Sequence, residues 1–196
     1  MAETTKAAGT TARFLVEERA IQHAATRRRE DFVTGRECAR EALGMLGLSP
    51  APIPIGPFRA AVWPEGYTGS ITHTDGYWAA AAAPAEAVAA LGIDAETNQL
   101  LAEDVATLVL SSEEMAESRP YDWSLIFSAK ESVFKAWSSQ NPGRWLDFYD
   151  VHLTVSDDRF SAFVRPDGAN WTGSYRRTAT HIFTCVVRKG SSHADP

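Results

Sequence analysis

Hydrophobic residues recur at helical spacing in three parts of the chain. The first part, residues 13–46, predicts a helix with a break near 25–29. The second part, residues 103–118, predicts an amphipathic helix that is interrupted where Ser111–Ser112 could cap a new helix. The third part, residues 127–137, carries the clearest helical pattern.

At 3.6 residues per turn, the segment 127–137 separates into two sides. The apolar side, expected to face the core, consists of Phe127, Val133, Phe134 and Trp137. The polar side consists of Ser128, Glu131, Ser132, Lys135 and Ser138. Glu131 and Lys135 are four residues apart and therefore neighbours on the helix surface. Taken alone, this spacing indicates an exposed ion pair worth roughly a few tenths of a kcal/mol. Asp122 and Ser124 are the predicted caps of this helix.

A hairpin is predicted around the turn signal Asp75–Gly76. Its second strand would be the alanine run 79–83, which Pro84 closes. Alanine favours helix by intrinsic propensity, so a helical run is the alternative. The short span between Gly76 and Pro84 favours the strand.

Residues 91–96 predict a short strand that places Asp94 and Glu96 on the same face. Two such carboxylates repel each other unless water, a cation or a base lies between them. The alternative is an exposed strand end, where Asp and Glu are common. Three later segments, 151–155, 160–164 and 178–187, predict a small antiparallel sheet.

With 196 residues, the chain is long enough for one core or for two small lobes. Residues 1–12 predict a disordered tail without a secretion signal, and 191–196 predict a second tail. Cys38 and Cys185 lie far apart, which predicts reduced thiols and a cytoplasmic protein. No apolar run has the length of a membrane span.

The net charge of −6 argues against nucleic-acid binding, yet one segment concentrates positive charge. It contains Arg27, Arg28, Arg29, Arg36 and Arg40. This concentration indicates a local anion site. For each arginine, the alternative is a solvated side chain or one paired with an acid of the same segment.

Asp94, Glu96 and Glu131 would together supply three hard oxygen donors, which favour Mg²⁺, or Mn²⁺, over zinc. A lysine beside such an ion is typical of a pyrophosphate contact. These residues indicate metal-assisted chemistry at a phosphate, without identifying the substrate.

The sequence resembles the bacterial 4'-phosphopantetheinyl transferases of the class that activates enterobactin and surfactin synthetases. The resemblance rests on five ordered motifs within residues 27–148: RREDFVTGRECAR (28–40), WPEG (63–66), GSITH (69–73), GIDAE (92–96) and FSAKESVFKAW (127–137). The stretch RWLDF (144–148) also resembles the family. Each motif alone is weak or moderate, whereas the ordered set is specific.

The resemblance implies an α+β fold of two similar α/β lobes in one chain, a pseudo-dimer with a coenzyme A cleft between the lobes. It places the N-terminal lobe at 13–90 and the C-terminal lobe, with the metal site, at 91–190. It implies Mg²⁺-dependent transfer of the phosphopantetheine arm of coenzyme A to a serine of an acyl or peptidyl carrier protein, with release of adenosine 3',5'-bisphosphate. The carrier could belong to fatty acid, polyketide, nonribosomal peptide or siderophore synthesis. A monomer is expected, because one chain holds every motif.

The resemblance also implies roles for individual residues. The metal ligands would be Asp94, Glu96 and Glu131. The contacts to coenzyme A would be Arg28, Arg36, Thr72, His73, Lys130 and Lys135. Glu131, Lys135 and Glu96 would act in catalysis, and the base would be Glu131, Glu96 or a metal-bound water.

The chain departs from the resemblance at Ile55, where related enzymes often carry a basic residue. Either Arg59 takes over that phosphate contact, or fewer charges hold coenzyme A. An alternative function is a non-catalytic module that binds coenzyme A or a carrier protein. Such a module would need the arginines, but it would not need the three acids together with Lys135. A nucleic-acid binder would rest on the arginine cluster alone.

Overall fold

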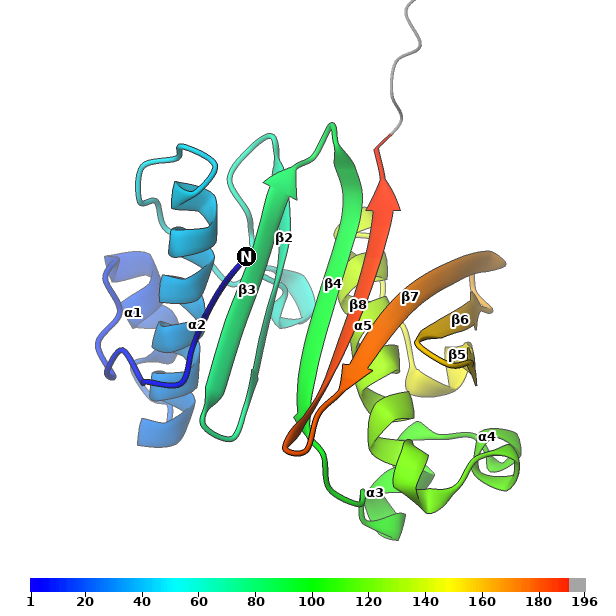
Figure 1. Ribbon diagram of the computed structural model, residues 1–196. Coiled ribbons are helices and arrows are strands. Elements are labelled where there is room, and N and C mark those ends of the chain that lie inside the picture. Colours follow the sequence, from blue (N-terminus) through cyan, green and yellow to red (C-terminus); the bar gives the residue numbers. More distant parts are fainter. Residues whose placement is uncertain (191–196) are drawn as a thin grey trace, which may run out of the picture. The chain divides into compact units, whose positions relative to one another are not determined.

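The computed structural model describes residues 1–190, so the predicted tail at 191–196 lies outside the described residues. The chain divides into two compact units. Unit 1 is Met1–Leu91 together with the chain from Arg188 on, and unit 2 is Gly92–Val187. Figure 1 labels the elements along the chain, and two strands, β4 (Val88–Thr97) and β8 (His181–Lys189), pass from one unit to the other.

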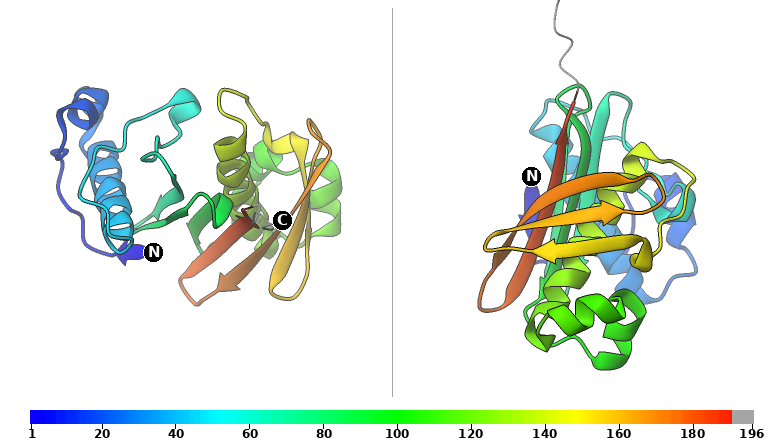
Figure 2. Two further views of the ribbon diagram at one scale, coloured as in Figure 1. Left: turned by 90° about the horizontal axis from the view of Figure 1, so that it is seen from above. Right: turned by 90° about the vertical axis from the view of Figure 1, so that its right-hand side faces the viewer.

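In unit 1, helix α2 lies against a three-stranded antiparallel sheet of order β1-β3-β2 (Figure 2, left). The elements of this unit are β1 (Ala2–Thr4), α1 (Leu15–Ile21), α2 (Thr26–Gly44), the 3-10 turn η1 (Pro57–Arg59), β2 (Tyr67–Thr74) and β3 (Tyr77–Pro84). The predicted hairpin is confirmed, since Thr74 pairs with Tyr77 and the turn residue Gly76 has φ +68°. The alanine run is a strand, and Ala80 on it is fully buried.

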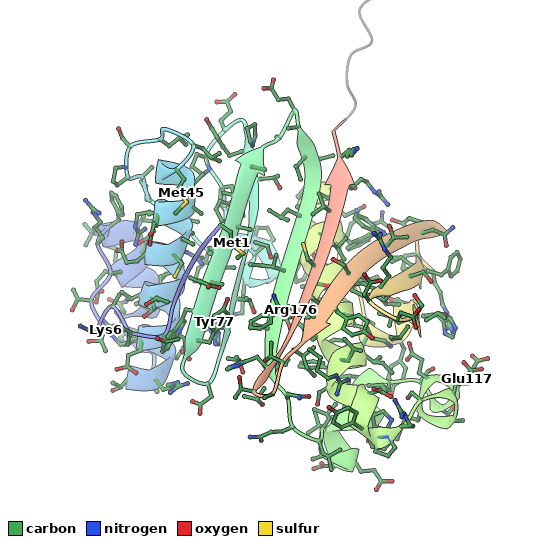
Figure 3. The ribbon with its side chains drawn as sticks, viewed as in Figure 1. Met1, Lys6, Met45, Tyr77, Glu117 and Arg176 are labelled. Carbon is green, nitrogen blue, oxygen red and sulfur yellow. The ribbon has the colours of Figure 1, made fainter. Side chains whose placement is uncertain are left out.

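The predicted disordered tail at 1–12 is wrong at its beginning. Ala2–Thr4 forms β1, which pairs with β3, and Ala2 is buried. Figure 3 shows Met1 and Tyr77 along this sheet, and the Tyr77 hydroxyl donates a hydrogen bond to Glu3. A short strand adds to the sheet edge because β3 offers it unpaired backbone groups, which a local reading of the tail does not reveal.

In unit 2, helix α5 lies against a five-stranded sheet of order β4-β8-β7-β6-β5 (Figure 2, right). The remaining elements are α3 (Glu103–Val109), α4 (Ser112–Glu117), η2 (Pro120–Asp122), α5 (Trp123–Gln140), η3 (Phe148–Asp150), β5 (Val151–Val155), β6 (Arg159–Val164) and β7 (Ala169–Arg177). The predicted helix break is confirmed, because Ser111 caps α4 through the Glu114 amide. Strand β7 was missed, since its alternation of small and polar residues is weak.

Helix α5 is buried more widely than its pattern predicts. Val133 and Trp137 lie in the core as expected, but Ser128 and Ser132 on the polar side are also fully buried. Asp122 precedes α5 without capping it; instead, its carboxylate pairs with Arg119 and Arg177. Much of the polar side of α5 therefore packs against other parts of the protein.

Two other sequence expectations concern membrane-spanning helices and the state of the cysteines. None of the helices found within residues 1–190 has the length and apolar character needed to cross a bilayer. Cys38 and Cys185 are both free thiols.

Candidate active site

The backbones of β4 and α5 touch at Gly92. A Cβ atom at Gly92 would lie 1.9 Å from the carbonyl oxygen of Ser132 and 2.9 Å from the backbone nitrogen of Ala136. Only glycine permits this approach, because real Cβ atoms do not come so close to backbone atoms. The contact lays the polar side of α5 against the strand that carries Asp94 and Glu96.

The result is an acid–lysine group formed by Asp94, Glu96, Glu131 and Lys135, all in unit 2. Lys135 Nζ lies 2.6 Å from Asp94 Oδ1 and 4.0 Å from Glu131 Oε2. It also donates a hydrogen bond to the carbonyl oxygen of Ile93 at 3.3 Å. The exposed i,i+4 pair is therefore not the main interaction of Lys135, which is turned towards the strand.

Electrostatic effects connect all four members of this group. Burial raises the pKa of Glu96 to about 7, and the negative charge of Asp94 adds to the shift. Burial also raises the pKa of Glu131, although the charge of Lys135 opposes that shift. Burial alone would lower the pKa of Lys135, but the charges of Asp94 and Glu131 outweigh it and raise the pKa. Three carboxylates thus share the positive charge of one lysine.

Asp94 is held from its other side by Ser128, which Thr184 contacts in turn; the sequence analysis assigned neither residue to the site. Ser128 Oγ donates to Asp94 Oδ2 at 2.8 Å and lies 3.0 Å from Thr184 Oγ1. The Thr184 hydroxyl donates to the carbonyl oxygen of Ser128 at 2.9 Å. Ser128 stood inside a recognised motif, whereas Thr184 is on β8 and no local pattern singles it out.

The acid–lysine group is not assembled as a ready metal site. Among residues 1–190, no three His, Cys, Asp or Glu side chains are arranged to hold a metal ion together. Asp94, Glu96 and Glu131 nevertheless fit Mg²⁺ or Mn²⁺ chemically, because these ions prefer carboxylate oxygens. The three carboxylates also repel one another, and a bound cation would reduce that repulsion. Lys135 supplies one positive charge beside Asp94.

Lys130 does not match the phosphate contact predicted for it. Its side chain is fully buried, and Nζ contacts Glu114 Oε2 at 2.7 Å. The same ammonium donates to the carbonyl oxygens of Val109 and Phe148. An ammonium with three partners inside the protein is not presented to a ligand, so we leave Lys130 out of the proposed site.

In unit 1, three arginines form an arginine group: Arg28, Arg36 and Arg59. Burial lowers the pKa of Arg28, and the charge of Arg59 adds to the effect. Burial lowers the pKa of Arg36 to about 10, and the charge of Arg28 contributes. The three guanidinium groups therefore lie within electrostatic reach, and an anion among them would relieve their repulsion.

Arg59 reaches this group from a tightly folded loop. A bridge between Ile55 and Ala61 closes the loop around η1. Phe58 and Arg59 both have positive φ angles, 49° and 65°, which L-residues rarely adopt. The loop is thus folded back at the cost of backbone strain, which places the Arg59 side chain near Arg28.

The other arginines of the cluster are paired, with acids both inside and outside the segment in which the sequence analysis expected partners. Their partners are Asp75 and Asp31 for Arg27, Glu18 for Arg29, and Glu17 and Glu37 for Arg40. Two of these partners, Glu17 and Glu18, come from α1. Arg27, Arg29 and Arg40 are therefore bound to acids, although the charge of Arg40 still lowers the pKa of Arg36.

Thr72 and His73 lie near the end of β2. Thr72 is buried, and the half-exposed His73 has Nδ1 3.9 Å from Asp31 Oδ1. Asp31 also accepts a hydrogen bond from Trp78 Nε1 at 3.0 Å. Asp31 is a further residue that the sequence analysis did not assign to the site.

Together, these features define a two-unit α+β protein with an acid-rich group on β4 and α5 and an arginine group on α2 and the following loop. Two family models match the chain: the 4'-phosphopantetheinyl transferase N-terminal domain at residues 16–83 and the 4'-phosphopantetheinyl transferase superfamily at residues 90–186.

Relatives support the same family. The chain is 37% identical to the 4'-phosphopantetheinyl transferase PptT of Mycobacterium tuberculosis, over 78% of this chain and 72% of that protein. It is 46% identical to the 4'-phosphopantetheinyl transferase Svp of Streptomyces mobaraensis, over 70% of this chain and 59% of that protein. It is 34% identical to enterobactin synthase component D of Salmonella typhi, over 61% of this chain and 53% of that protein. The chain belongs to the 4'-phosphopantetheinyl transferase family, as the motifs predicted.

Proposed function

We propose that this protein transfers the 4'-phosphopantetheine arm of coenzyme A to a serine of an acyl or peptidyl carrier protein. The carrier changes from its apo to its holo form, and adenosine 3',5'-bisphosphate is released. Beyond family membership, the observation that carries the proposal is the convergence of Asp94, Glu96, Glu131 and Lys135 at the contact between β4 and α5.

In this proposal, Asp94, Glu96 and Glu131 hold Mg²⁺, or Mn²⁺, when coenzyme A is bound. The ion would neutralise charge on the diphosphate as the leaving group departs. Lys135 would turn from Asp94 Oδ1 to the diphosphate, which exchanges one anionic partner for another. Ser128 would keep Asp94 oriented during the exchange, because it bonds the opposite oxygen.

The transfer also needs a base for the serine hydroxyl. The serine oxygen attacks the phosphorus that carries the pantetheine arm, the bond from that phosphorus to adenosine bisphosphate breaks, and the hydroxyl proton passes to the base. Glu96 and Glu131 remain the candidates. In the metal-free protein, burial raises the pKa of Glu96 to about 7, so this carboxylate is a stronger base than an ordinary glutamate.

Arg28, Arg36, Arg59, Thr72 and His73 would bind the nucleotide phosphates, chiefly the 3'-phosphate. The arginine group supports this role because its guanidinium groups repel one another and would be stabilised by an anion. Arg59 would take the contact that related enzymes make from the position of Ile55. The two-lobe arrangement with coenzyme A between the lobes, the monomeric state and the cytoplasmic location stay predictions.

The alternative is a non-catalytic module that binds coenzyme A or a carrier protein. It accounts for the arginine group but gives no role to the three acids and Lys135 of unit 2. The deciding experiment incubates the protein with coenzyme A, Mg²⁺ and a panel of apo-carrier proteins and follows the carrier mass. We expect a gain equal to one phosphopantetheine arm, prevented by a chelator. Binding of coenzyme A with no modification of any carrier would favour the non-catalytic module.

A further inference from the structure

We propose that Glu17, on helix α1, is a positioning residue that holds Arg36 and the Ile53 peptide in the arrangement needed to bind the 3'-phosphate of coenzyme A. This inference rests on the proposed function, because it concerns the same phosphate. Glu17 lies outside the motifs that carry the family resemblance.

Glu17 is fully buried, which is unusual for a carboxylate. Its Oε1 accepts hydrogen bonds from Arg40 Nη1 and from the backbone nitrogen of Ile53, both at 2.8 Å. Within residues 1–190, its Oε2 has no hydrogen-bond partner. Burying a carboxylate with one unpaired oxygen costs free energy. We therefore expect Glu17 to do more than link α1 to α2.

The Ile53 residue connects Glu17 to Arg36. Glu17 binds the N–H of Ile53, and Arg36 Nε donates to the carbonyl oxygen of Ile53 at 2.7 Å. Ile53 itself is fully buried. The two charged side chains therefore hold the same residue from its two backbone polar groups, at the start of the loop that leads to Arg59.

Charge supports the same connection. Arg36 is 6% exposed, and its guanidinium carbon lies 4.5 Å from the centroid of the Phe32 ring. Burial lowers its pKa to about 10, and the charge of Glu17 opposes that shift while Arg40 and Arg28 add to it. The charge of Glu17 thus partly offsets the repulsion between Arg36 and the other arginines.

The neighbouring Glu18 provides a matched comparison on the same helix. It pairs with Arg29 of α2 and accepts a hydrogen bond from the amide of Ala12. Like Glu17, it fastens α1 to α2, but it makes no contact with Ile53 or Arg36. Glu18 is partly exposed whereas Glu17 is fully buried, so E18Q tests the loss of a contact between α1 and α2, and the R36A background tests the positioning role.

The test compares dissociation constants for coenzyme A and 3'-dephospho-coenzyme A, measured by calorimetry with the full chain. We expect E17Q to reduce the preference for coenzyme A about tenfold, with the dephospho form binding as before. The amide cannot supply the negative charge or accept both bonds as strongly. In an R36A background, E17Q should cause no further reduction, and E18Q should keep the wild-type preference.

The outcomes separate the two proposals. An E17Q variant with the wild-type preference, or equal losses in E17Q and E18Q, would overturn the role of Glu17. If E17Q does not fold, E17D is used, since it keeps the charge but withdraws the oxygen from Ile53; failure of both to fold would assign Glu17 a structural role only. A wild-type protein with no preference for the 3'-phosphate would instead contradict the phosphate contacts of the proposed function.

Discussion

Lys135 Nζ lies 2.6 Å from Asp94 Oδ1, although 41 residues separate the two positions in the chain. The contact exists because α5 crosses β4 at Gly92, so that the helix turns Lys135 towards the strand. Glu131, four residues away on the same helix, is the more distant partner at 4.0 Å. The Glu131–Lys135 pair, which is local in the sequence, therefore belongs to a group of charges that tertiary structure brings together.

Replacing Asp94 with Asn should reduce the rate of carrier modification by at least about 100-fold. Asn keeps the size of the side chain and can still accept the hydrogen bond from Ser128, but it removes the charge that would bind the metal and that pairs with Lys135. Initial rates from carrier masses and Mg²⁺ titration by calorimetry in the presence of coenzyme A would measure the effect.

The control for this variant is Glu117→Gln, which removes an exposed acid at the end of α4 (Figure 3). It should retain wild-type turnover and Mg²⁺ affinity. Near-normal turnover in Asp94→Asn, and likewise in Glu131→Gln, would refute the metal assignment.

Gly92→Ala should destabilise the protein by about 3 kcal/mol or more, because the new methyl group would overlap the backbone of α5. We also expect lower turnover at temperatures where the variant is folded, since the separation of α5 from β4 moves Lys135 away from Asp94. Urea unfolding and carrier modification would test the two effects.

Gly44→Ala is the matched glycine control, because a Cβ atom there meets nothing within 4 Å. It should leave turnover unchanged and raise the free energy of unfolding by about 0.5 kcal/mol. Wild-type stability and turnover in Gly92→Ala would show that the close backbone contact is not needed.

Glu96 should make the stability of the metal-free protein depend on pH. Its folded pKa, about 7, is above the ordinary value of 4.5, so between these values the folded state binds more protons than the unfolded state. The stabilising effect of the protonated form is complete below about pH 4.5 and is lost as the pH rises through 7. Glu96→Gln stays neutral and should therefore become more stable than wild type towards pH 8, by about 1–3 kcal/mol.

Urea unfolding from pH 4.5 to 8 with a chelator present would measure this difference. A difference between variant and wild type that does not change over the range would contradict the raised pKa of Glu96. Adding Mg²⁺ and coenzyme A should reduce the difference at pH 8, because a bound cation favours the charged carboxylate.

Lys130→Ala should destabilise unit 2 by about 3–5 kcal/mol, because it leaves Glu114 as a buried charge without its partner. The dissociation constant for coenzyme A, measured where the variant is folded, should stay within about twofold of wild type. Normal stability combined with a large loss of affinity would instead support the phosphate contact that the sequence predicted for Lys130.

Local patterns in the sequence determined much of the architecture and the family. The turn at Asp75–Gly76 marked the hairpin, and Ser111 marked the break between α3 and α4. The motif at 127–137 located the helix that carries Glu131 and Lys135. These features depend on neighbours within a few residues, which is why the sequence alone could predict them.

Tertiary structure decided which charges meet. No neighbour in the sequence indicates that Arg40 is paired with the buried Glu17, 23 residues away, or that Lys130 is buried with Glu114, 16 residues away. Thr184 reaches Ser128 from a strand 56 residues away. Whether a charged side chain binds a ligand or stabilises the core depends on its burial and on partners distant in the chain, and only the folded arrangement of helices and strands sets both.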